Sequence, residues 1–486
     1  MILKHRDTEV LRFDWVEPFG VKNVELNRSA ERFLPLAFRD RVRKDPDSLG
    51  YWLEEWLLHR TPPLSRRGIR DMLRYLGFHE DDPSWKRNLI TFSRGLSLND
   101  VHWVVADDST EMWETANLYD NPFSTAVASM AFTGEKRQGV RDASTSPEYS
   151  TNGNLRKCWR RLNGEILLYK GGGHDGGGLL EHRNAVGYEP FSEYYAAQLA
   201  AAMKLPHVPY GLAQFKYRLC STCPLFTSDK TGFLAARYVM DRDVARKDIR
   251  FADIFFFDAI IFNTDRHLGN FGFLVDNDVN ELAGVAPIFD NGHSLFSQAI
   301  SEPGVKDNEF KDLRKFLLRV EPKLYTHWLD IPGGITDEMI DRLKGLGKFE
   351  FKQHPDFIMP DNRLEVSQYF LQNRIDKVIR YREKADGYLS IRRKDVTINP
   401  MVSDKLLKKA KEAGDLRKEL KATLKSFPLA KTEKLAILFK TTTRTIARYI
   451  RALQDAGELK RVGSRKTGYW QVIEQPIEQS GERKET

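Results

Sequence analysis

Three polar residues near the middle of the chain have the types and the spacing that phosphoryl transfer requires. Asp265 is followed by Asn270 five residues later and by Asp290 twenty residues after that. One carboxylate can accept a hydrogen bond from an attacking hydroxyl, while an amide oxygen and a second carboxylate can hold Mg²⁺ against phosphate oxygens. Since Mg²⁺ keeps several waters and needs few protein ligands, we predict Asp265 as the catalytic base and Asn270 and Asp290 as the metal ligands.

Two residues beside this base and a second group upstream complete the predicted site. Arg266 and His267 follow Asp265 directly and are positioned to orient the loop or the leaving phosphate. Lys170 closes an expected strand, where it can hold the α- and β-phosphates of ATP, and Glu193 near the start of the next helix is its natural partner. A lysine at a strand end is more often simply solvated.

The phosphate-facing loop is predicted from a turn that precedes these residues. Ser150, Thr151 and Gly153 belong to the run Ser-Thr-Asn-Gly-Asn, whose backbone N–H groups could cover phosphates. A turn of this composition is more often only a turn. Ser144, Thr145, Ser146, Ser150 and Thr151 also give this region many hydroxyl groups, which motivates the hypothesis that phosphorylation of the loop switches the enzyme off.

The elements that must position these residues can be read from the apolar pattern. The apolar run 252–262 predicts a buried helix that delivers the chain to Asp265, and 271–275 with 283–289 predicts a hairpin that presents Asp290. The segments 156–161 and 165–169 predict two strands around the tight turn Asn163-Gly164, with Lys170 at the end of the second. A helix is expected to start at Pro190.

The arrangement of motifs resembles that of HipA-like kinases, which are distant relatives of protein and phosphatidylinositol kinases. The resemblance rests on the run 263–270 with Asp290, and on Glu189–Tyr194, Pro206–Tyr210 and Cys223–Thr227. It covers roughly residues 136–390. The phosphate loop departs from the best-known form of the family because it contains one glycine.

The resemblance implies a serine/threonine protein kinase that uses ATP and Mg²⁺. It also implies the roles given above to Asp265, Asn270, Asp290 and Lys170. The family includes toxin kinases that arrest growth, usually held by a DNA-binding antitoxin. The implied fold is α+β and bilobal, with an N-lobe at 136–240 and a helical C-lobe at 241–400. Residues 1–135 are expected to be a mixed, mainly helical region of unknown role.

The last part of the chain differs from the rest in charge. Residues 401–486 hold 20 Lys and Arg against 11 Asp and Glu, whereas residues 1–400 hold 56 against 57. This asymmetry favours a nucleic-acid-facing domain. A charged linker at 401–414 is expected to lead into a winged helix-turn-helix at 415–476, followed by a disordered tail at 477–486.

Within that domain, residues 444–456 are expected to form a helix with Ile446, Ile450 and Leu453 on one face and arginines on the other. The arginine face could enter a DNA major groove, and a basic hairpin tip could contact phosphates. The predicted DNA contacts are Thr442, Arg444, Arg448, Arg451, Lys460, Arg461, Arg465 and Lys466. A helical hairpin with a solvated basic side is the alternative.

Bulk composition is that of an ordinary globular protein. The chain has 486 residues, 41% hydrophobic and 30% charged, which predicts two to four domains, and it has three cysteines. We expect a cytoplasmic protein with no membrane association, a protein substrate and a possible homodimer. Two alternatives remain: a DNA-binding regulator whose kinase-like domain senses nucleotide, and a kinase-fold enzyme that acts on a small molecule.

Overall fold

The computed structural model describes most of the first 394 residues and parts of the rest. The described ranges are 1–17, 20–135, 143–173, 188–297, 331–359, 361–394, 420–421, 423–425, 432, 435–436, 439, 442–462 and 469–473. Residues 1–383 form one compact unit and residues 384–486 a second. In the described part of the chain, no helix combines the length and the apolar character needed to cross a membrane.

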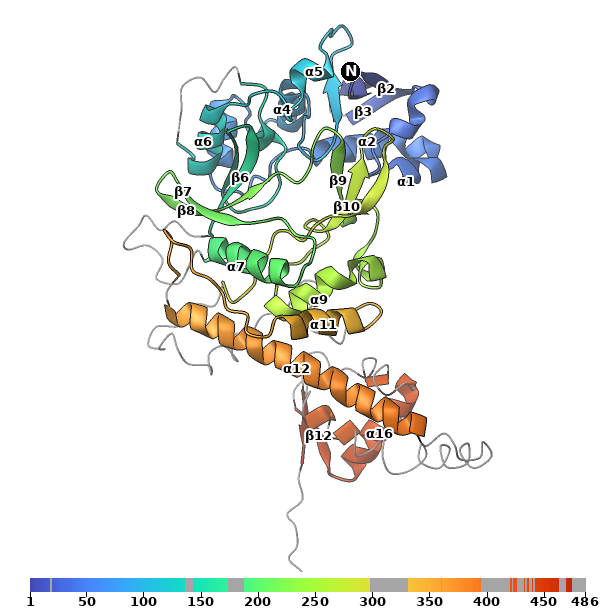
Figure 1. Cartoon of the computed structure of the whole chain (residues 1–486). Helices are drawn as coiled ribbons and strands as arrows, with labels where there is room; N and C mark the ends of the chain where they lie inside the picture. The colour runs from blue at the N-terminus through green and yellow to red at the C-terminus, as the bar shows by residue number, and fades with distance from the viewer. Residues whose placement is uncertain are drawn as a thin grey trace, which may run out of the picture. The chain divides into compact units, whose positions relative to one another are not determined.

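The chain begins with a four-stranded antiparallel sheet in the order β3-β2-β1-β4 (Figure 1). Its strands are β1 (Ile2–His5), β2 (Thr8–Val16), β3 (Gly20–Leu26) and β4 (His102–Val105). The same part of the chain contains the short helices α1 (Arg39–Lys44), α2 (Leu49–Leu58), α3 (Ile69–Tyr75), α4 (Trp85–Ser93), α5 (Trp113–Ala116) and α6 (Thr125–Thr133). The region is therefore mixed, as predicted, but the sequence analysis missed the three strands that open it.

A second four-stranded sheet carries the predicted hairpin. The order is β5-β6-β8-β7, built from β5 (Lys157–Leu162), β6 (Glu165–Gly171), β7 (Gly211–Phe215) and β8 (Arg218–Pro224). Asn163 and Gly164 have φ of 50° and 86°, which a tight two-residue turn requires. The hairpin prediction is confirmed. Helix α7 (Glu189–Ala202) packs on this sheet, below β7 and β8 in Figure 1.

The third part of the first unit contains a three-stranded sheet and the main helical core. The sheet order is β11-β10-β9, from β9 (Thr231–Ala235), β10 (Gly272–Asp276) and β11 (Glu281–Val285). Helix α9 (Ala252–Ile261) is buried on nearly every side, as its apolar sequence predicts. The strand predicted at 283–289 instead ends at Val285, so Asp290 lies on a loop five residues beyond it.

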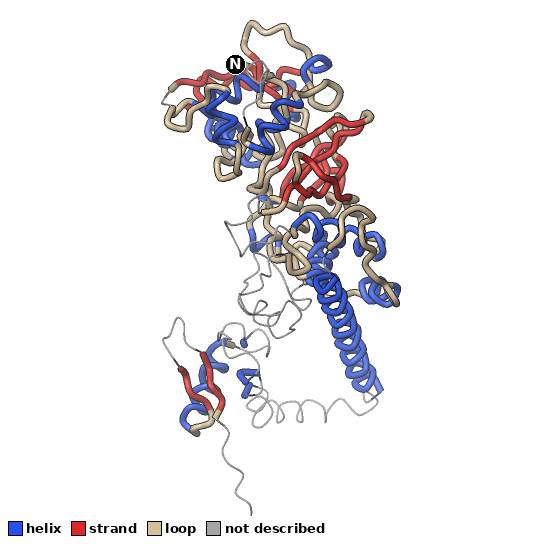
Figure 2. Tube along the Cα trace, turned by 90° about the vertical axis from the view of Figure 1, so that its left-hand side faces the viewer, coloured by secondary structure: helices blue, strands red, loops and turns tan. Residues whose placement is uncertain are grey.

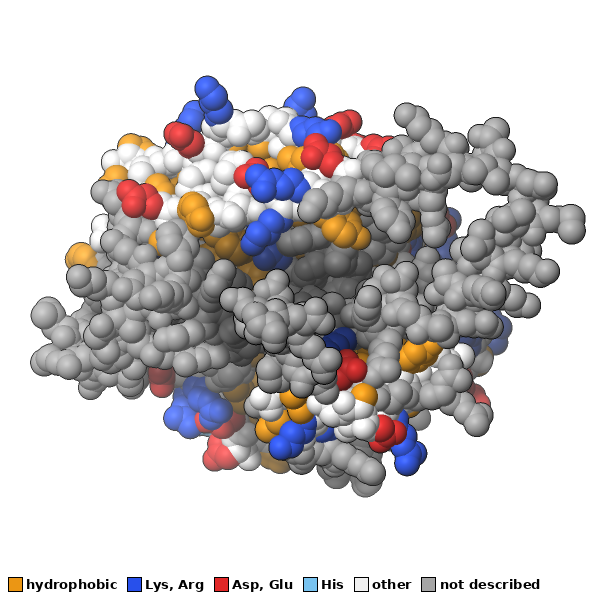
Figure 3. Space-filling model, turned by 90° about the horizontal axis from the view of Figure 1, so that it is seen from below, with side chains coloured by type: hydrophobic (Ala, Val, Ile, Leu, Met, Phe, Trp, Pro, Cys, Tyr) orange, Lys and Arg blue, Asp and Glu red, His pale blue; other side chains and the backbone are white. Residues whose placement is uncertain are grey.

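Two further helices complete the core around α9. Apolar side chains of α11 (Asp337–Gly345) and α12 (Asp361–Lys394) join one buried cluster with those of α7 and α9. Figure 2 shows α12 as one long continuous helix. The short helix α8 (Arg242–Ala245) precedes α9 in the chain. On the face seen in Figure 3, the described basic side chains are interspersed with acidic ones.

The second unit contains the predicted helix and hairpin. Helix α16 (Thr443–Asp455) buries Ile446, Ile450 and Leu453, the three residues assigned to its apolar face. Strands β12 (Leu459–Val462) and β13 (Tyr469–Val472) pair antiparallel. The predicted linker at 401–414 and tail at 477–486 lie outside the described residues.

Candidate active site

The end of helix α9 fixes the start of the Asp265 loop. Phe262 adopts φ of 54°, a left-handed conformation that stops the helix. The fully buried Asp258, one turn earlier, accepts from the side-chain amide of Asn263 at 3.0 Å. Asn263 Oδ1 in turn accepts from the backbone N–H of Asp265 at 3.0 Å. The backbone at Asp265 is therefore held by a chain of hydrogen bonds that begins inside the helix.

Arg266 is a buried connector of this loop. Its side chain is 1% exposed and forms a two-pronged ion pair with Asp258, with both hydrogen bonds at 2.8 Å. One nitrogen, Nη1, donates to the carbonyls of Asn270 at 2.8 Å and Phe289 at 2.7 Å, and Nη2 also donates to Asn291 Oδ1 at 2.7 Å. All of its N–H donors are used by these internal bonds. The sequence left two roles open for Arg266, orienting the loop or the leaving phosphate, and the hydrogen bonds favour orienting the loop. The guanidinium therefore links the loop that carries Asn270 to the segment that carries Asp290.

His267 and Asn270 close the loop on itself. Asn270 Oδ1 accepts from the backbone N–H of His267 at 2.9 Å, and its side-chain amide donates to the carbonyl of Asp265 at 3.3 Å. His267 Nδ1 accepts from the backbone N–H of Gly269 at 3.0 Å. An amide oxygen has two lone pairs, so Asn270 Oδ1 keeps one for a metal ion.

Lys170 lies between two carboxylates. Its Nζ donates to Glu193 Oε1 at 2.7 Å and to Asp290 Oδ1. Glu193, which is fully buried on α7, also accepts from the backbone N–H of Asn291 at 2.7 Å. Burial alone would lower the pKa of Lys170, but Asp290 and Glu193 more than offset it and raise that pKa above its usual value. The predicted Lys170–Glu193 pair is present and extends to Asp290.

Asp290 has two marks of a functional position. Its φ is 58°, which is uncommon for a residue with a side chain and stores backbone strain. Burial opposes its charge, yet Lys170 and Lys157 hold the pKa of Asp290 well below its ordinary value. Within the described residues, its Oδ2 atom accepts no hydrogen bond. A charged carboxylate oxygen therefore faces the site.

Lys157 is a candidate site residue that the sequence analysis missed. It pairs directly with Lys170 across the hairpin, and its side chain is 7% exposed. In the described part of the chain it forms no ion pair. Burial first, and then repulsion from Lys170 and Arg66, lowers the pKa of Lys157 to about 7. The turn Asn163-Gly164 sets the register of this hairpin, and that register places residue 157 opposite Lys170. Lys157 could therefore have been identified from the sequence by counting back from the turn.

The turn predicted to cover phosphates lies at the cavity described below, and its hydroxyl groups bond to the protein. Ser150 Oγ donates to the carbonyl of Leu96 at 2.7 Å, and Thr151 Oγ1 donates to the carbonyl of Pro147 at 2.6 Å. Gly153 has φ of 94°, and a Cβ atom there would lie 2.3 Å from Lys157 Nζ. The left-handed backbone favours glycine at this position, and a larger residue there would displace the end of the Lys157 side chain.

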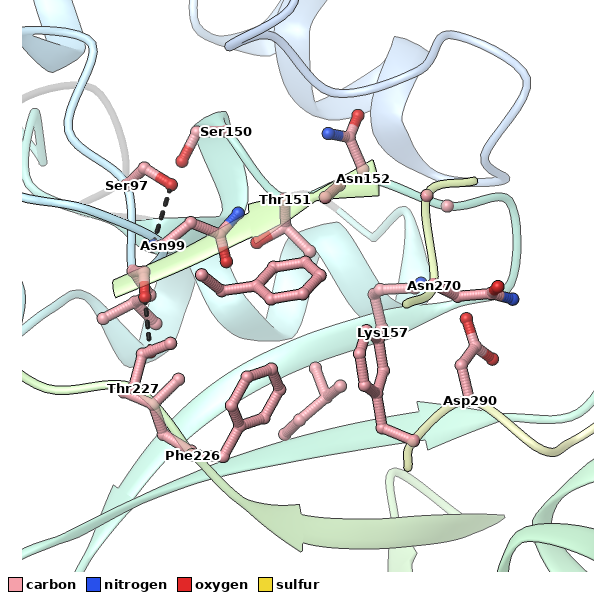
Figure 4. Close-up of a pocket in the computed structure, with 18 of the residues that line it drawn as sticks. Ser97, Asn99, Ser150, Thr151, Asn152, Lys157, Phe226, Thr227, Asn270 and Asp290 are labelled. Carbon is pink, nitrogen blue, oxygen red and sulfur yellow. Dashed lines mark hydrogen bonds between the residues drawn. The ribbon is translucent and has the colours of Figure 1, made fainter. Parts of the chain in front are cut away.

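One cavity of about 440 Å³ brings most of these residues together. Figure 4 shows Lys157, Asn270 and Asp290 at one side, with Ser97, Asn99, Phe226 and Thr227 at the other and the loop at Thr151 and Asn152 between them. Of the predicted site residues the cavity is lined by Ser150, Thr151, Gly153, Lys170, His267, Asn270 and Asp290. Asp265, Arg266 and Glu193 are not among its lining residues. Asp265 is half-buried.

The donor set at Asn270 and Asp290 fits Mg²⁺. Both residues line the same cavity, and Asn270 Oδ1 and Asp290 Oδ2 each keep a free lone pair as described above. One neutral and one charged oxygen is a ligand set that Mg²⁺ accepts when phosphates and waters supply the rest. Among the described residues there is no cluster of three His, Cys, Asp or Glu that would suit another metal.

The predicted DNA contacts are described only in part. Thr442 caps α16, because its Oγ1 accepts from the backbone N–H of Thr445 at 3.2 Å. Arg451 and Lys460 are exposed, and Arg461 stacks on the ring of Trp470 at 4.6 Å. The side chains of Arg444 and Arg448 are outside the description, as are Arg465 and Lys466 entirely.

Comparison with known proteins gives limited similarities to kinases. Over 135 residues the chain is 29% identical to the serine/threonine-protein kinase CtkA of Helicobacter pylori, a match that covers 22% of this chain and 41% of that relative. This chain thus spans less than half the length of the relative. No protein-family model matches the chain.

Two solved structures are also similar. The proinflammatory kinase CtkA of Helicobacter pylori has a TM-score of 0.35 and 18% identity, covering 47% of this chain and 95% of its own. The toxin–antitoxin complex of HipA, HipB and operator DNA from Shewanella oneidensis has a TM-score of 0.37 and 12% identity, covering 78% and 90%. The chain is mixed in helix and sheet, and in part of its sequence it is similar to a serine/threonine kinase, in agreement with the resemblance to HipA-like kinases.

Proposed function

We propose that the first unit is an ATP-dependent serine/threonine protein kinase that uses Mg²⁺. The observation that carries the proposal is the buried ion-pair chain from Glu193 through Lys170 to Asp290, in a cavity that also holds Asn270 and Lys157. A lysine fixed by two carboxylates is suited to contact phosphate oxygens without losing its charge. The similarity to a protein named as a serine/threonine kinase supports the same reaction.

In the proposed reaction Asp265 accepts a hydrogen bond from the hydroxyl of a Ser or Thr side chain and takes its proton. The hydroxyl oxygen forms a bond to the γ-phosphorus as the bond from that phosphorus to the β-phosphate oxygen breaks, which releases ADP. Arg266 acts through the loop and is a positioning residue, since its donors are all used by Asp258 and by neighbouring carbonyls.

The other residues hold the phosphates in place. Lys170 and Lys157 bind phosphate oxygens, and the backbone of Thr151–Gly153 covers them. Asn270 and Asp290 would hold Mg²⁺, which when bound neutralises charge on the β- and γ-phosphates. The aromatic and polar side of the cavity at Phe226 and Thr227 takes the base.

Parallel labelling tests this proposal. Transfer of label from γ-³²P-ATP to a protein, with none from α-³²P-ATP, supports phosphoryl transfer, whereas label from the α-position alone would indicate nucleotidyl transfer. Asp265→Asn should abolish transfer while leaving ADP binding intact. The control is Asp243→Asn, an exposed carboxylate on α8 that should keep full activity. Equal transfer by both variants would remove Asp265 as the base.

We also propose that the second unit binds DNA. Its helix α16 buries one face and exposes Arg451, and the adjoining strand exposes Lys460. Cations on an exposed face next to a hairpin are suited to contact phosphates, so binding should weaken steeply with salt. A gel-shift series across salt concentrations tests this. Coupling of the two units would make the protein a DNA-bound growth regulator, and arrest of a host by the wild type but not by Asp265→Asn would support that role.

A further inference from the structure

Arg66 is a buried cation on the far side of the phosphate loop. It lies in the turn before α3, where its backbone N–H donates to the carbonyl of Pro63 at 3.0 Å and its carbonyl accepts from Ile69. The side chain is 1% exposed. It belongs to the N-terminal 135 residues, for which the sequence analysis found no role.

The guanidinium of Arg66 holds the loop by its backbone. Nε donates to the carbonyl of Gly153 at 3.0 Å, and Nη2 donates to the carbonyl of Thr151. The adjacent Ser65 donates from its Oγ to Asn154 Oδ1 at 2.7 Å. The two bonds from Arg66 occupy the carbonyl oxygens of Thr151 and Gly153, and the N–H groups of the same peptides, which belong to Asn152 and Asn154, point the opposite way.

Other segments of the N-terminal region reach the same cavity. Leu96 accepts from Ser150 Oγ at 2.7 Å, and Leu98 accepts from Thr227 Oγ1 at 2.5 Å. Ser97 and Asn99 line the cavity on the same side as Thr227, with Ser97 near Ser150 (Figure 4). The N-terminal region thus forms hydrogen bonds with residues on two sides of the cavity, Ser150 in the loop and Thr227 opposite it.

Arg66 is held at this place without a salt bridge among the described residues. Glu148 acts on Arg66 electrostatically, but its carboxylate accepts hydrogen bonds from Ser146 Oγ and from the backbone N–H of Trp159, the latter at 2.7 Å. Arg66 Nη1 is buried with no hydrogen-bond partner in the described part of the chain. Burying a guanidinium in this way opposes folding, so packing alone gives no reason for it.

We propose that Arg66 is a positioning residue for the phosphate loop, and that the N-terminal region builds the nucleotide site. Arg66 fixes the Thr151–Gly153 backbone in the shape that contacts nucleotide phosphates, and it leaves the base end of the cavity unaffected. The inference rests on the proposed function for the identity of the ligand. The claim that Arg66 orders the loop can be tested in the absence of any nucleotide.

Nucleotide affinities test the ligand part. Arg66→Met keeps most of the side-chain volume and removes the donors, and Arg67→Met is the control, because Arg67 is the exposed neighbour with the same charge. By isothermal titration calorimetry, Arg66→Met should lose about tenfold or more in ADP affinity while adenosine affinity is unchanged. Arg66→Lys, which can keep one hydrogen bond, should restore part of the loss. Arg67→Met should match the wild type for both ligands.

Hydrogen exchange of the ligand-free protein tests the loop part. The amides of residues 151–154 should exchange faster in Arg66→Met than in Arg67→Met, with α7 and α9 unchanged. If Arg66→Met does not fold, the exposed Ser65→Ala should give the same loop-restricted change to a smaller degree. Equal loss of ADP and adenosine affinity, or unchanged exchange in residues 151–154, overturns the inference. Faster loop exchange in a protein whose wild type binds no nucleotide supports the loop role and refutes the proposed function alone.

Discussion

The buried Lys157 should make nucleotide binding depend on pH near neutrality. Burial and two neighbouring cations lower the pKa of Lys157 to about 7 in the ligand-free protein. A lysine with this pKa is about nine-tenths protonated at pH 6 and about one-tenth protonated at pH 8. Since phosphate binds the protonated form, its contribution to affinity should fall about tenfold over this range, or about 1.4 kcal/mol.

Comparison with Lys157→Arg isolates this effect. Arginine stays charged at both pH values, so the affinity of this variant should lack the Lys157 component. The phosphate groups of ADP also titrate in this range, but they do so with both proteins. The ratio of the ADP dissociation constants, wild type over Lys157→Arg, should therefore rise about tenfold from pH 6 to pH 8. A ratio that stays constant in calorimetric titrations would refute the assignment of Lys157 as a phosphate ligand with a lowered pKa.

The same lowered pKa has an opposite consequence for stability. Between pH 7 and 10.5, an unfolded lysine binds a proton that the folded Lys157 does not, so the stability of the ligand-free protein rises with pH across this window. Lys157→Met removes this dependence. It should raise the free energy of unfolding at pH 7 while it weakens ADP binding, and the gain should shrink as the pH approaches 10.5. Denaturant unfolding at several pH values measures this; a variant less stable than the wild type at pH 7 would contradict it.

Three other perturbations have defined expectations. Glu193→Gln leaves Lys170 with one carboxylate and should reduce phosphoryl transfer by about 10²-fold, measured with γ-³²P-ATP, through misplacement of that lysine. Arg266→Met leaves the buried Asp258 unpaired and should destabilise the protein by about 3–5 kcal/mol in denaturant unfolding, whereas a surface change at Arg67 should not. Lys460→Gln in the second unit should lower the slope of log affinity against log salt by about one for DNA binding, in gel shifts compared with the wild type.

The part of the site that sequence predicts is the part that is local. Asp265 and Asn270 lie on one loop, and the helix that delivers them is recognisable because the run 252–261 is apolar except for Asp253 and Asp258. Residue types alone predict Asn270 and Asp290 as metal ligands, since Asn and Asp oxygens suit Mg²⁺. The pairing of Lys170 with Glu193 was also predictable, because a strand-end lysine and a following helix form a recurring unit.

Lys157 was predictable from the same hairpin but was not predicted. The turn Asn163-Gly164 fixes the register of β5 against β6, and that register places residue 157 opposite residue 170. The missed strand β2 is a similar case, because Leu11 and Phe13 are buried while Arg12 and Asp14 are exposed. Alternation of this kind is visible in the sequence. In both cases the sequence contained the information, in the register of the hairpin and in the two-residue period of the strand.

Arg66 could not have been predicted in this way. The oxygens that it bonds lie 85 and 87 residues later in the chain, and they are backbone carbonyls, which carry no side-chain signature. An arginine in a polar turn before a helix looks like a solvated residue on any local criterion. Only the packing of the N-terminal region on the sheet that carries β5 turns it inward. Contacts from side chain to distant backbone are the class that sequence patterns do not encode.

The buried charges around the cavity suggest what the contacts of Arg66 and Lys157 are for. Lys170 is balanced by Glu193 and Asp290, but Lys157 and Arg66 are buried without an ion pair of their own in the described chain. Two desolvated cations beside one loop reduce the stability of the protein when no ligand is bound, as the lowered pKa of Lys157 also indicates. An anion bound to this loop would turn the charge of Lys157 from destabilising to stabilising, because the attraction between opposite charges is strong where water is excluded. The proposed phosphate binding at this site predicts that nucleotide raises the unfolding temperature of the wild type more than that of Lys157→Met.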